Sequence, residues 1–116
     1  MADAFFDNWT TQLRKGVLEL CILNAIRTGS RYGYDIVKRI RGIEGLVIGE
    51  GTVYPLLSRL RQEGLIASTI EESPEGPARR CYRLTARGRE QLRNMNLHWK
   101  SLGGGVQTLQ EEKDHD

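Results

Sequence analysis

Residues 50–84, EGTVYPLLSRLRQEGLIASTIEESPEGPARRCYRL, contain one change in the period of their hydrophobic residues. Before Gly64, apolar residues recur at the spacing of one helical face: Val53, Leu56, Leu57 and Leu60. After Gly64, apolar and polar residues alternate over 65–71 and again over 79–84, which is the pattern of two strands. The Pro- and Gly-containing segment between them is typical of a turn. The stretch therefore predicts a helix over roughly 50–63 followed directly by a β-hairpin.

Two further helices are expected before this stretch. Residues 13–26 are apolar on nearly every side, which is typical of a buried central helix, and Gly29 is placed to cap its end. A second helix is expected from about Tyr32 to Arg41, with basic residues in its last turns.

The segment that links the second and third helices carries two further signals. The short apolar run 46–48 indicates a minimal strand. Pro55 lacks a backbone donor, so the third helix is expected to begin near Gly51 or Thr52.

A long last helix follows the hairpin, with Thr85 as its N-cap. Its apolar residues are spaced as a heptad seam, which requires a partner helix: Leu92, Met95, Trp99, Leu102, Val106 and Leu109. Three consecutive glycines, 103–105, lie on the polar side of this helix and predict a kink or fraying there. Residues 111–116 form an acidic tail that we expect to be disordered.

The order of these elements is three helices, a hairpin and a long helix. This order predicts a mainly α fold with a small β-hairpin, the winged helix-turn-helix, followed by a C-terminal dimerisation helix. We expect a DNA-binding domain with an N-terminal helical extension over 1–84, the dimerisation helix over 85–110, and the tail over 111–116.

Composition and charge indicate which partners the protein can have. The 116 residues carry a net charge of +2, but residues 10–93 hold +6 and the segments on either side hold −2 each. A basic middle with acidic ends favours a polyanionic partner. The N-terminus lacks the basic region of a signal peptide and no run is long enough to span a membrane, so we expect a cytoplasmic protein without a membrane partner.

Five motifs resemble the PadR family of bacterial transcriptional regulators and occur in the order typical of that family. They are QLRKGVLELC at 12–21, RYGYDI at 31–36, EGTVYPLLSRL at 50–60, EGL at 63–65 and GPARRCYRLT at 76–85. The resemblance covers residues 9 to about 102 and implies the smaller subfamily, in which one C-terminal helix forms the dimer.

The sequence departs from the family pattern at three places. Gly49 stands where a serine N-cap is common, Cys81 replaces a usual aromatic residue, and the glycine triplet weakens the last helix. None of them lies on the expected DNA face.

The expected DNA-binding residues come from three elements. The third helix would read the major groove, the second would hold phosphates, and the hairpin would reach the backbone or the minor groove. The residues are Tyr32, Tyr34, Lys38, Thr52, Tyr54, Ser58, Arg59, Arg79 and Arg80. Tyr32 and Tyr34 are equally compatible with a place in the core. The interpretation requires Thr52 and Arg59 to face the same side as the hairpin.

A homodimer would present two recognition helices to an inverted-repeat operator. Its expected interface combines the heptad seam with an aromatic stripe at the N-terminus, namely Phe5, Phe6 and Trp9. Because some PadR relatives bind planar aromatic effectors between their C-terminal helices, Trp99 is either an aromatic residue of the dimer core or part of an effector site. Repression relieved by a small aromatic effector is the function that the resemblance implies.

Two other classes of protein are the alternatives to a DNA-binding regulator. A winged helix can also serve as a protein-interaction module that never binds DNA. An enzyme is not expected, because the chain has no nucleotide-binding or nucleophile motif and its two histidines have no catalytic partners. No cofactor and no metal site are predicted, and the paired cysteines of a metal-sensing repressor are absent from the third helix.

Overall fold

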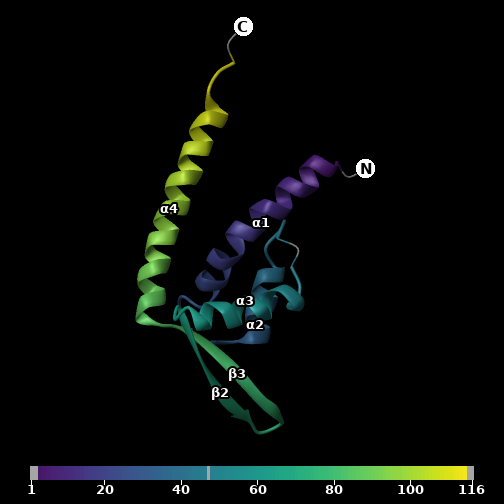
Figure 1. Ribbon diagram of the computed structural model, residues 1–116, viewed down its shortest axis with the longest axis vertical. Helices are drawn as coiled ribbons and strands as arrows, with labels where there is room; N and C mark the ends of the chain where they lie inside the picture. The colour runs from purple at the N-terminus through teal and green to yellow at the C-terminus, as the bar shows by residue number, and fades with distance from the viewer. Residues whose placement is uncertain (1–2, 47, 115–116) are drawn as a thin grey trace.

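The computed structural model describes residues 3–46 and 48–114 (Figure 1). Within these ranges four helices and three strands follow one another: α1 (Ala4–Ala25), β1 (Arg31–Tyr32), α2 (Gly33–Arg41), α3 (Glu50–Gln62), β2 (Ile66–Ser73), β3 (Gly76–Leu84) and α4 (Ala86–Glu111). The molecule is elongated, 68 Å in its longest direction. Helices α1 and α4 diverge from the helical centre toward one end, and the β2–β3 hairpin extends from the other (Figure 1).

One hydrophobic core joins the three N-terminal helices to the base of the sheet. The predicted helical stripe of α3 is confirmed, since Val53, Leu57 and Leu60 are fully buried. Ile22 and Leu23 of α1 are fully buried as well, as expected for a helix that is apolar on most sides.

The sheet has three antiparallel strands in the order β1-β3-β2, one more than the predicted hairpin. The sequence places Tyr32 at the start of a helix, but Tyr32 is the N-cap of α2 and belongs to β1 with Arg31. Arg31 pairs with Tyr82 and Tyr32 with Cys81, and Arg31 Nε also donates to the Ala25 carbonyl at 2.7 Å. A two-residue strand is too short to produce a periodic pattern, so only its distant partner reveals it.

The predicted hairpin is confirmed, but its strands are longer than expected. Gly76 is already in β3 and Ser73 still in β2, so the turn is shorter than the Pro- and Gly-containing segment suggests. The expected strand over 46–48 is wrong where it is described, since Leu46 lies in a turn and Ile48 in no regular element. Val47 lies outside the described residues.

Helix α3 begins at Glu50, one or two residues before the expected start, with Gly49 as its N-cap. Pro55 therefore lies inside the helix, one turn after Gly51. Because proline has no N–H, the carbonyl of Gly51, four positions earlier, receives no helical hydrogen bond from residue 55. The helix ends before Gly64, whose φ of +79° is accessible mainly to glycine.

Hydrogen bonds of Thr85 fix the start of α4 against the two residues that precede β2. Thr85 caps the helix as predicted, because its Oγ1 accepts from the Gly88 N–H at 3.0 Å. The same hydroxyl donates to the Gly64 carbonyl at 2.6 Å, and the Thr85 N–H donates to the Leu65 carbonyl at 3.1 Å. A Cβ added to Gly88 would lie 1.9 Å from the Leu65 oxygen, so only glycine allows this approach.

Helix α4 is continuous through Gly103–Gly105 to Glu111, so the expected interruption at the glycines does not occur. Leu92 is buried in the chain's own core and Met95 is partly buried against it. The outer residues of the seam remain exposed, namely Trp99, Leu102, Val106 and Leu109. No helix in the described ranges is both long and apolar enough for a membrane span.

We predict that Gly88→Ala lowers the free energy of unfolding by about 3 kcal/mol or more, because the new methyl group meets a backbone carbonyl that cannot move without opening the β2–α4 junction. Gly104→Ala is the matched control. Its Cβ would meet open space, so it is expected to stabilise α4 by up to about 1 kcal/mol. Urea unfolding of both variants checks the prediction, and equal stability of the two would contradict it.

Candidate nucleic-acid interface

Tyrosines and arginines from α2, α3 and the hairpin gather around one small cavity of about 200 Å³. Its lining consists of Tyr32, Gly33, Tyr34, Tyr54, Arg79, Arg80 and Tyr82. We call this set the tyrosine–arginine cluster. Five of the predicted DNA-binding residues belong to it, and the first and last of them are more than 40 residues apart in the chain.

A close approach at Gly33 holds the cluster together. A Cβ at this position would lie 2.8 Å from Tyr54 Cε1 and 3.4 Å from Tyr82 Cε2. The Tyr-Gly-Tyr motif therefore has a physical role, because the missing side chain leaves room for the ring of Tyr54 against the first turn of α2. Tyr82 is buried and contributes to the core, whereas Tyr34 and Tyr54 remain exposed.

Three cations in or beside the cluster are held by specific contacts. The Arg79 guanidinium carbon is 5.2 Å from the centroid of the Tyr32 ring, and Lys38 Nζ is 5.5 Å from that of Tyr34. Arg80 Nη1 donates to Ser68 Oγ at 2.8 Å. These contacts orient the cations while leaving Lys38, Arg79 and Arg80 accessible at the surface.

Two tyrosines of the cluster retain their protons more strongly than usual. The Tyr32 hydroxyl donates to Glu71 Oε2 at 2.8 Å, and this bond, with the charge of Glu71, raises the pKa of Tyr32. Burial, followed by the charge of Glu50, raises the pKa of Tyr54. Both phenols keep their protons at neutral pH. The single O–H of Tyr32 is given to Glu71, so a phosphate contact by Tyr32 would replace that bond.

The two flanks of α3 face different elements. On one flank Tyr54 belongs to the tyrosine–arginine cluster, and Arg61 Nη1 lies 3.4 Å from Ser68 Oγ of β2. On the other flank Thr52 and Arg59 face α1, where Arg59 Nη2 is ion-paired with Glu19 Oε1. Thr52 and Arg59 thus point away from the hairpin, unlike the arrangement that the sequence interpretation required. Between the flanks lies Ser58, which is half-buried.

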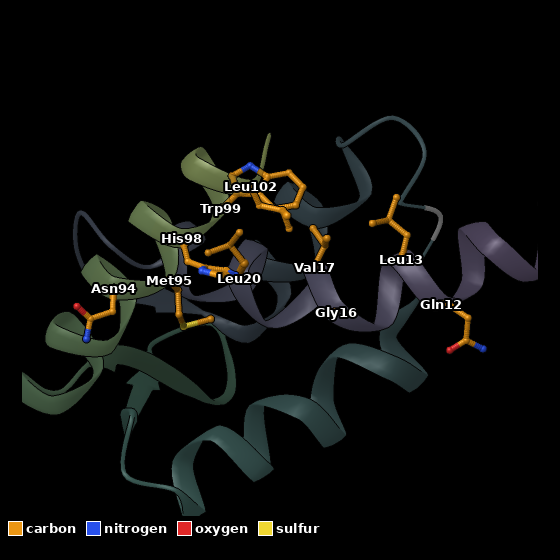
Figure 2. Close-up of a pocket in the computed structure, with 10 residues that line it drawn as sticks. All are labelled: Gln12, Leu13, Gly16, Val17, Leu20, Asn94, Met95, His98, Trp99 and Leu102. Atoms are coloured by element: carbon orange, nitrogen blue, oxygen red, sulfur yellow. The ribbon is translucent and has the colours of Figure 1, made fainter. Parts of the chain in front are cut away.

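A second site feature is an apolar cleft of about 490 Å³ between α1 and α4. Figure 2 shows Trp99 and Leu102 of α4 opposite Val17 and Leu20 of α1, with Met95 and His98 beside them. Met95, Trp99 and Leu102 of this lining were predicted from the heptad seam, whereas Asn94 and His98 were not. The α1 side was not predicted as part of a site, and its residues are Gln12, Leu13, Gly16, Val17 and Leu20. Their spacing of one helical face is the signal that could have revealed them.

A pair of amides joins the C-terminal end of α1 to α4. Asn24 Nδ2 donates to Asn96 Oδ1 at 2.9 Å, and Asn96 Nδ2 donates back to Asn24 Oδ1 at 3.0 Å. The C-terminal end of α1 is therefore tied to the middle of α4, and the two helices diverge from there toward their free ends (Figure 1). In the described part of the chain no cluster of acids, histidines and cysteines could hold a metal ion, and Cys21 and Cys81 are free thiols.

The comparison with known proteins identifies a family. The transcriptional regulator PadR-like family matches residues 22–94. A PadR-like transcriptional regulator of Bacillus cereus has 36% identity and a TM-score of 0.80, over 88% of this chain and 99% of that one. A PadR family transcriptional regulator of Eggerthella lenta has 33% identity and a TM-score of 0.79, over 94% and 95%. The PadR of Bacillus subtilis, in complex with operator DNA, has 28% identity and a TM-score of 0.60, over 68% of this chain and 46% of that one.

We predict that Glu71→Gln lowers the pH at which Tyr32 ionises, because the neutral amide no longer disfavours the phenolate. The folded-state pKa of Tyr32 is raised, so its contribution to stability is present at neutral pH and is lost as the pH rises through that pKa. Phenolate absorbance, compared with that of Tyr32→Phe to assign the residue, provides the measurement. Glu72→Gln is the control, since Glu72 is not among the groups that shift the pKa of Tyr32. An identical shift in both variants would argue against the Tyr32–Glu71 bond.

Proposed function

Because the chain belongs to the PadR-like family of transcriptional regulators, we propose that it binds double-stranded DNA through its winged helix-turn-helix and represses transcription from an inverted-repeat operator. Membership in this family confirms the prediction that the chain is not an enzyme. The observation that carries the proposal is the tyrosine–arginine cluster, which brings α2, α3 and the hairpin to one surface. A neighbour of the same fold, the Bacillus subtilis PadR, was solved with operator DNA.

In this proposal each element of the interface has a separate role. Helix α3 enters the major groove along its exposed side, so the exposed Thr52 and Tyr54 and the half-buried Ser58 are closest to base edges. The start of α2 and the hairpin lie along the backbone, where Tyr32, Tyr34, Lys38, Arg79 and Arg80 contact phosphates. Phosphate contacts of this kind provide affinity and orientation, whereas the α3 side chains provide sequence preference.

The proposed homodimer uses apolar surface that the single chain leaves exposed. Phe5, Phe6 and Trp9 line the free end of α1, and the rings of Phe6 and Trp9 stack with centroids 6.2 Å apart. Trp99 and the residues beyond it expose a second stripe on α4. Leu92 is not part of this interface, because the chain's own core covers it. Packing the two stripes of one copy against those of another would remove large apolar side chains from water.

We further propose that the cleft between α1 and α4 binds a small planar aromatic effector. Its lining is mainly apolar, and Trp99 offers an aromatic face within a volume that suits such a molecule (Figure 2). A ligand held between these helices would change the separation of the two recognition helices in the dimer. Operator affinity would then fall, because ligand and operator favour different arrangements of the same dimer.

Selection of bound sequences from random duplex DNA tests the proposal directly. We expect an inverted repeat whose half-sites are about 34 Å apart, or a multiple of that distance, as two recognition helices require. Affinity for the selected duplex should fall with rising salt, with a slope of about −0.9 per phosphate contacted. A protein-interaction module would enrich no sequence and would show no such salt dependence.

Two arginine variants provide the matched comparison for the same duplex. Arg79→Ala removes a cation of the cluster and is expected to reduce the salt slope by about 0.9. Arg93→Ala removes an exposed arginine of α4 and is expected to leave the slope unchanged. Equal effects of the two variants would show that the cluster is not the DNA surface.

We predict that Trp99→Ala weakens the dimer by about 1–3 kcal/mol, because it removes the largest exposed apolar side chain of α4. Sedimentation equilibrium over a range of concentrations measures the dissociation constant, and Lys100→Ala is the control on the adjacent exposed position. A dimer that keeps its affinity while the cleft no longer binds a planar aromatic dye would assign Trp99 to the effector site alone.

A further inference from the structure

Arg59 was expected to contact bases, but its surroundings differ from those of the other DNA-binding candidates. Its guanidinium is ion-paired with the carboxylate of Glu19, in the second half of α1. The pair is partly exposed, with 51% of the Arg59 side chain and 34% of the Glu19 side chain accessible to solvent. It links the last turn of the recognition helix to α1 across 40 residues of sequence.

The direction of Arg59 is set by helical geometry. Each residue advances a helix by about 100°, so residues two apart point to nearly opposite sides. Arg61 lies next to Ser68 of the hairpin, and Arg59 accordingly lies on the flank of α3 that faces α1. There it shares a shallow groove with Lys15, Glu19 and Pro55, away from the tyrosine–arginine cluster.

A carboxylate beside this arginine argues against a direct base contact. Moving Arg59 to a guanine edge would require breaking its bond to Glu19, which would leave the carboxylate without its partner near the DNA polyanion. The pair instead suits a connection between two helices. Helix α1 offers Glu19 on one side and lines the cleft with Leu13, Gly16 and Val17 on another.

We infer that Arg59 is a positioning residue, which fixes the recognition helix on α1 through Glu19 and does not read the operator itself. The inference rests on the proposed function, because it concerns how α3 is presented to DNA. The pair holds α3 in the orientation that binds, so losing either partner lowers the fraction of molecules in that orientation. Removing either partner should therefore weaken operator binding by a similar factor, although only Arg59 carries a charge that attracts DNA.

The test measures affinity for the selected duplex in variants of both partners. Glu19→Gln and Arg59→Gln are each expected to weaken binding by about two- to five-fold, the range of a partly exposed ion pair, without changing the salt slope. The loss for Glu19→Gln is diagnostic, because removing a negative charge near DNA would otherwise strengthen binding. Glu63→Gln, which removes an exposed carboxylate at the end of α3, is the control and should not weaken binding.

Charge reversal completes the test. Arg59→Glu alone is expected to lose more affinity than Arg59→Gln, and the combination of Glu19→Arg with Arg59→Glu is expected to return to within about two-fold of the original protein. If the reversed pair does not fold, as judged by circular dichroism, the neutral double variant replaces it and should bind no worse than either single variant.

Three results would overturn the inference. Arg59→Gln could weaken binding while Glu19→Gln does not, which would restore a direct DNA contact. Both single variants could bind as well as the original chain, which would make the pair a surface contact only. The reversed pair could fold but stay as weak as Arg59→Glu. Failure of the original chain to select any duplex would instead refute the proposed function.

Discussion

The close junction between the start of β2 and the start of α4 is the constraint on which the rest of the structure depends. The carbonyl of Leu65 accepts the N–H of Thr85 and lies where any side chain at Gly88 would have to be. The Thr85 hydroxyl also donates to the Gly64 carbonyl, so the residues just before the hairpin and just after it are held together. The direction of the hairpin and the direction of α4 are therefore set together.

This junction relates the two surfaces on which the proposed function depends. The tyrosine–arginine cluster lies on the side of the hairpin, and the apolar cleft lies between α1 and the long helix that begins at the junction. Helix α1 contributes to both halves of the molecule. It packs its buried face into the core, lines the cleft, and offers Glu19 to the recognition helix. In the proposed function, a change at the cleft would reach α3 through this one helix.

The tyrosine–arginine cluster depends on contacts between residues that are distant in the sequence. Gly33 has no side chain, so the ring of Tyr54 packs against the start of α2, and the exposed cations are held beside the rings of Tyr32 and Tyr34. These residues belong to motifs that identify the family in the sequence, and the structure explains their types by packing and orientation. Family membership is consistent with this explanation but does not itself assign a role to each side chain.

Much of the fold follows from short-range pattern alone. The periodicities of 3.6 and 2 residues, Gly64 and the Thr85 cap were sufficient to predict four helices and a hairpin, because each depends on neighbours a few residues away in the chain. The third strand, the burial of Leu92 and the α1 side of the cleft were not predicted. Each depends on which distant segment covers a given surface, and periodicity carries no information about that. The same reason applies to Arg59. Its exposed position on α3 was evident from the sequence, but its pairing with Glu19 exists only because the tertiary structure brings α1 and α3 together.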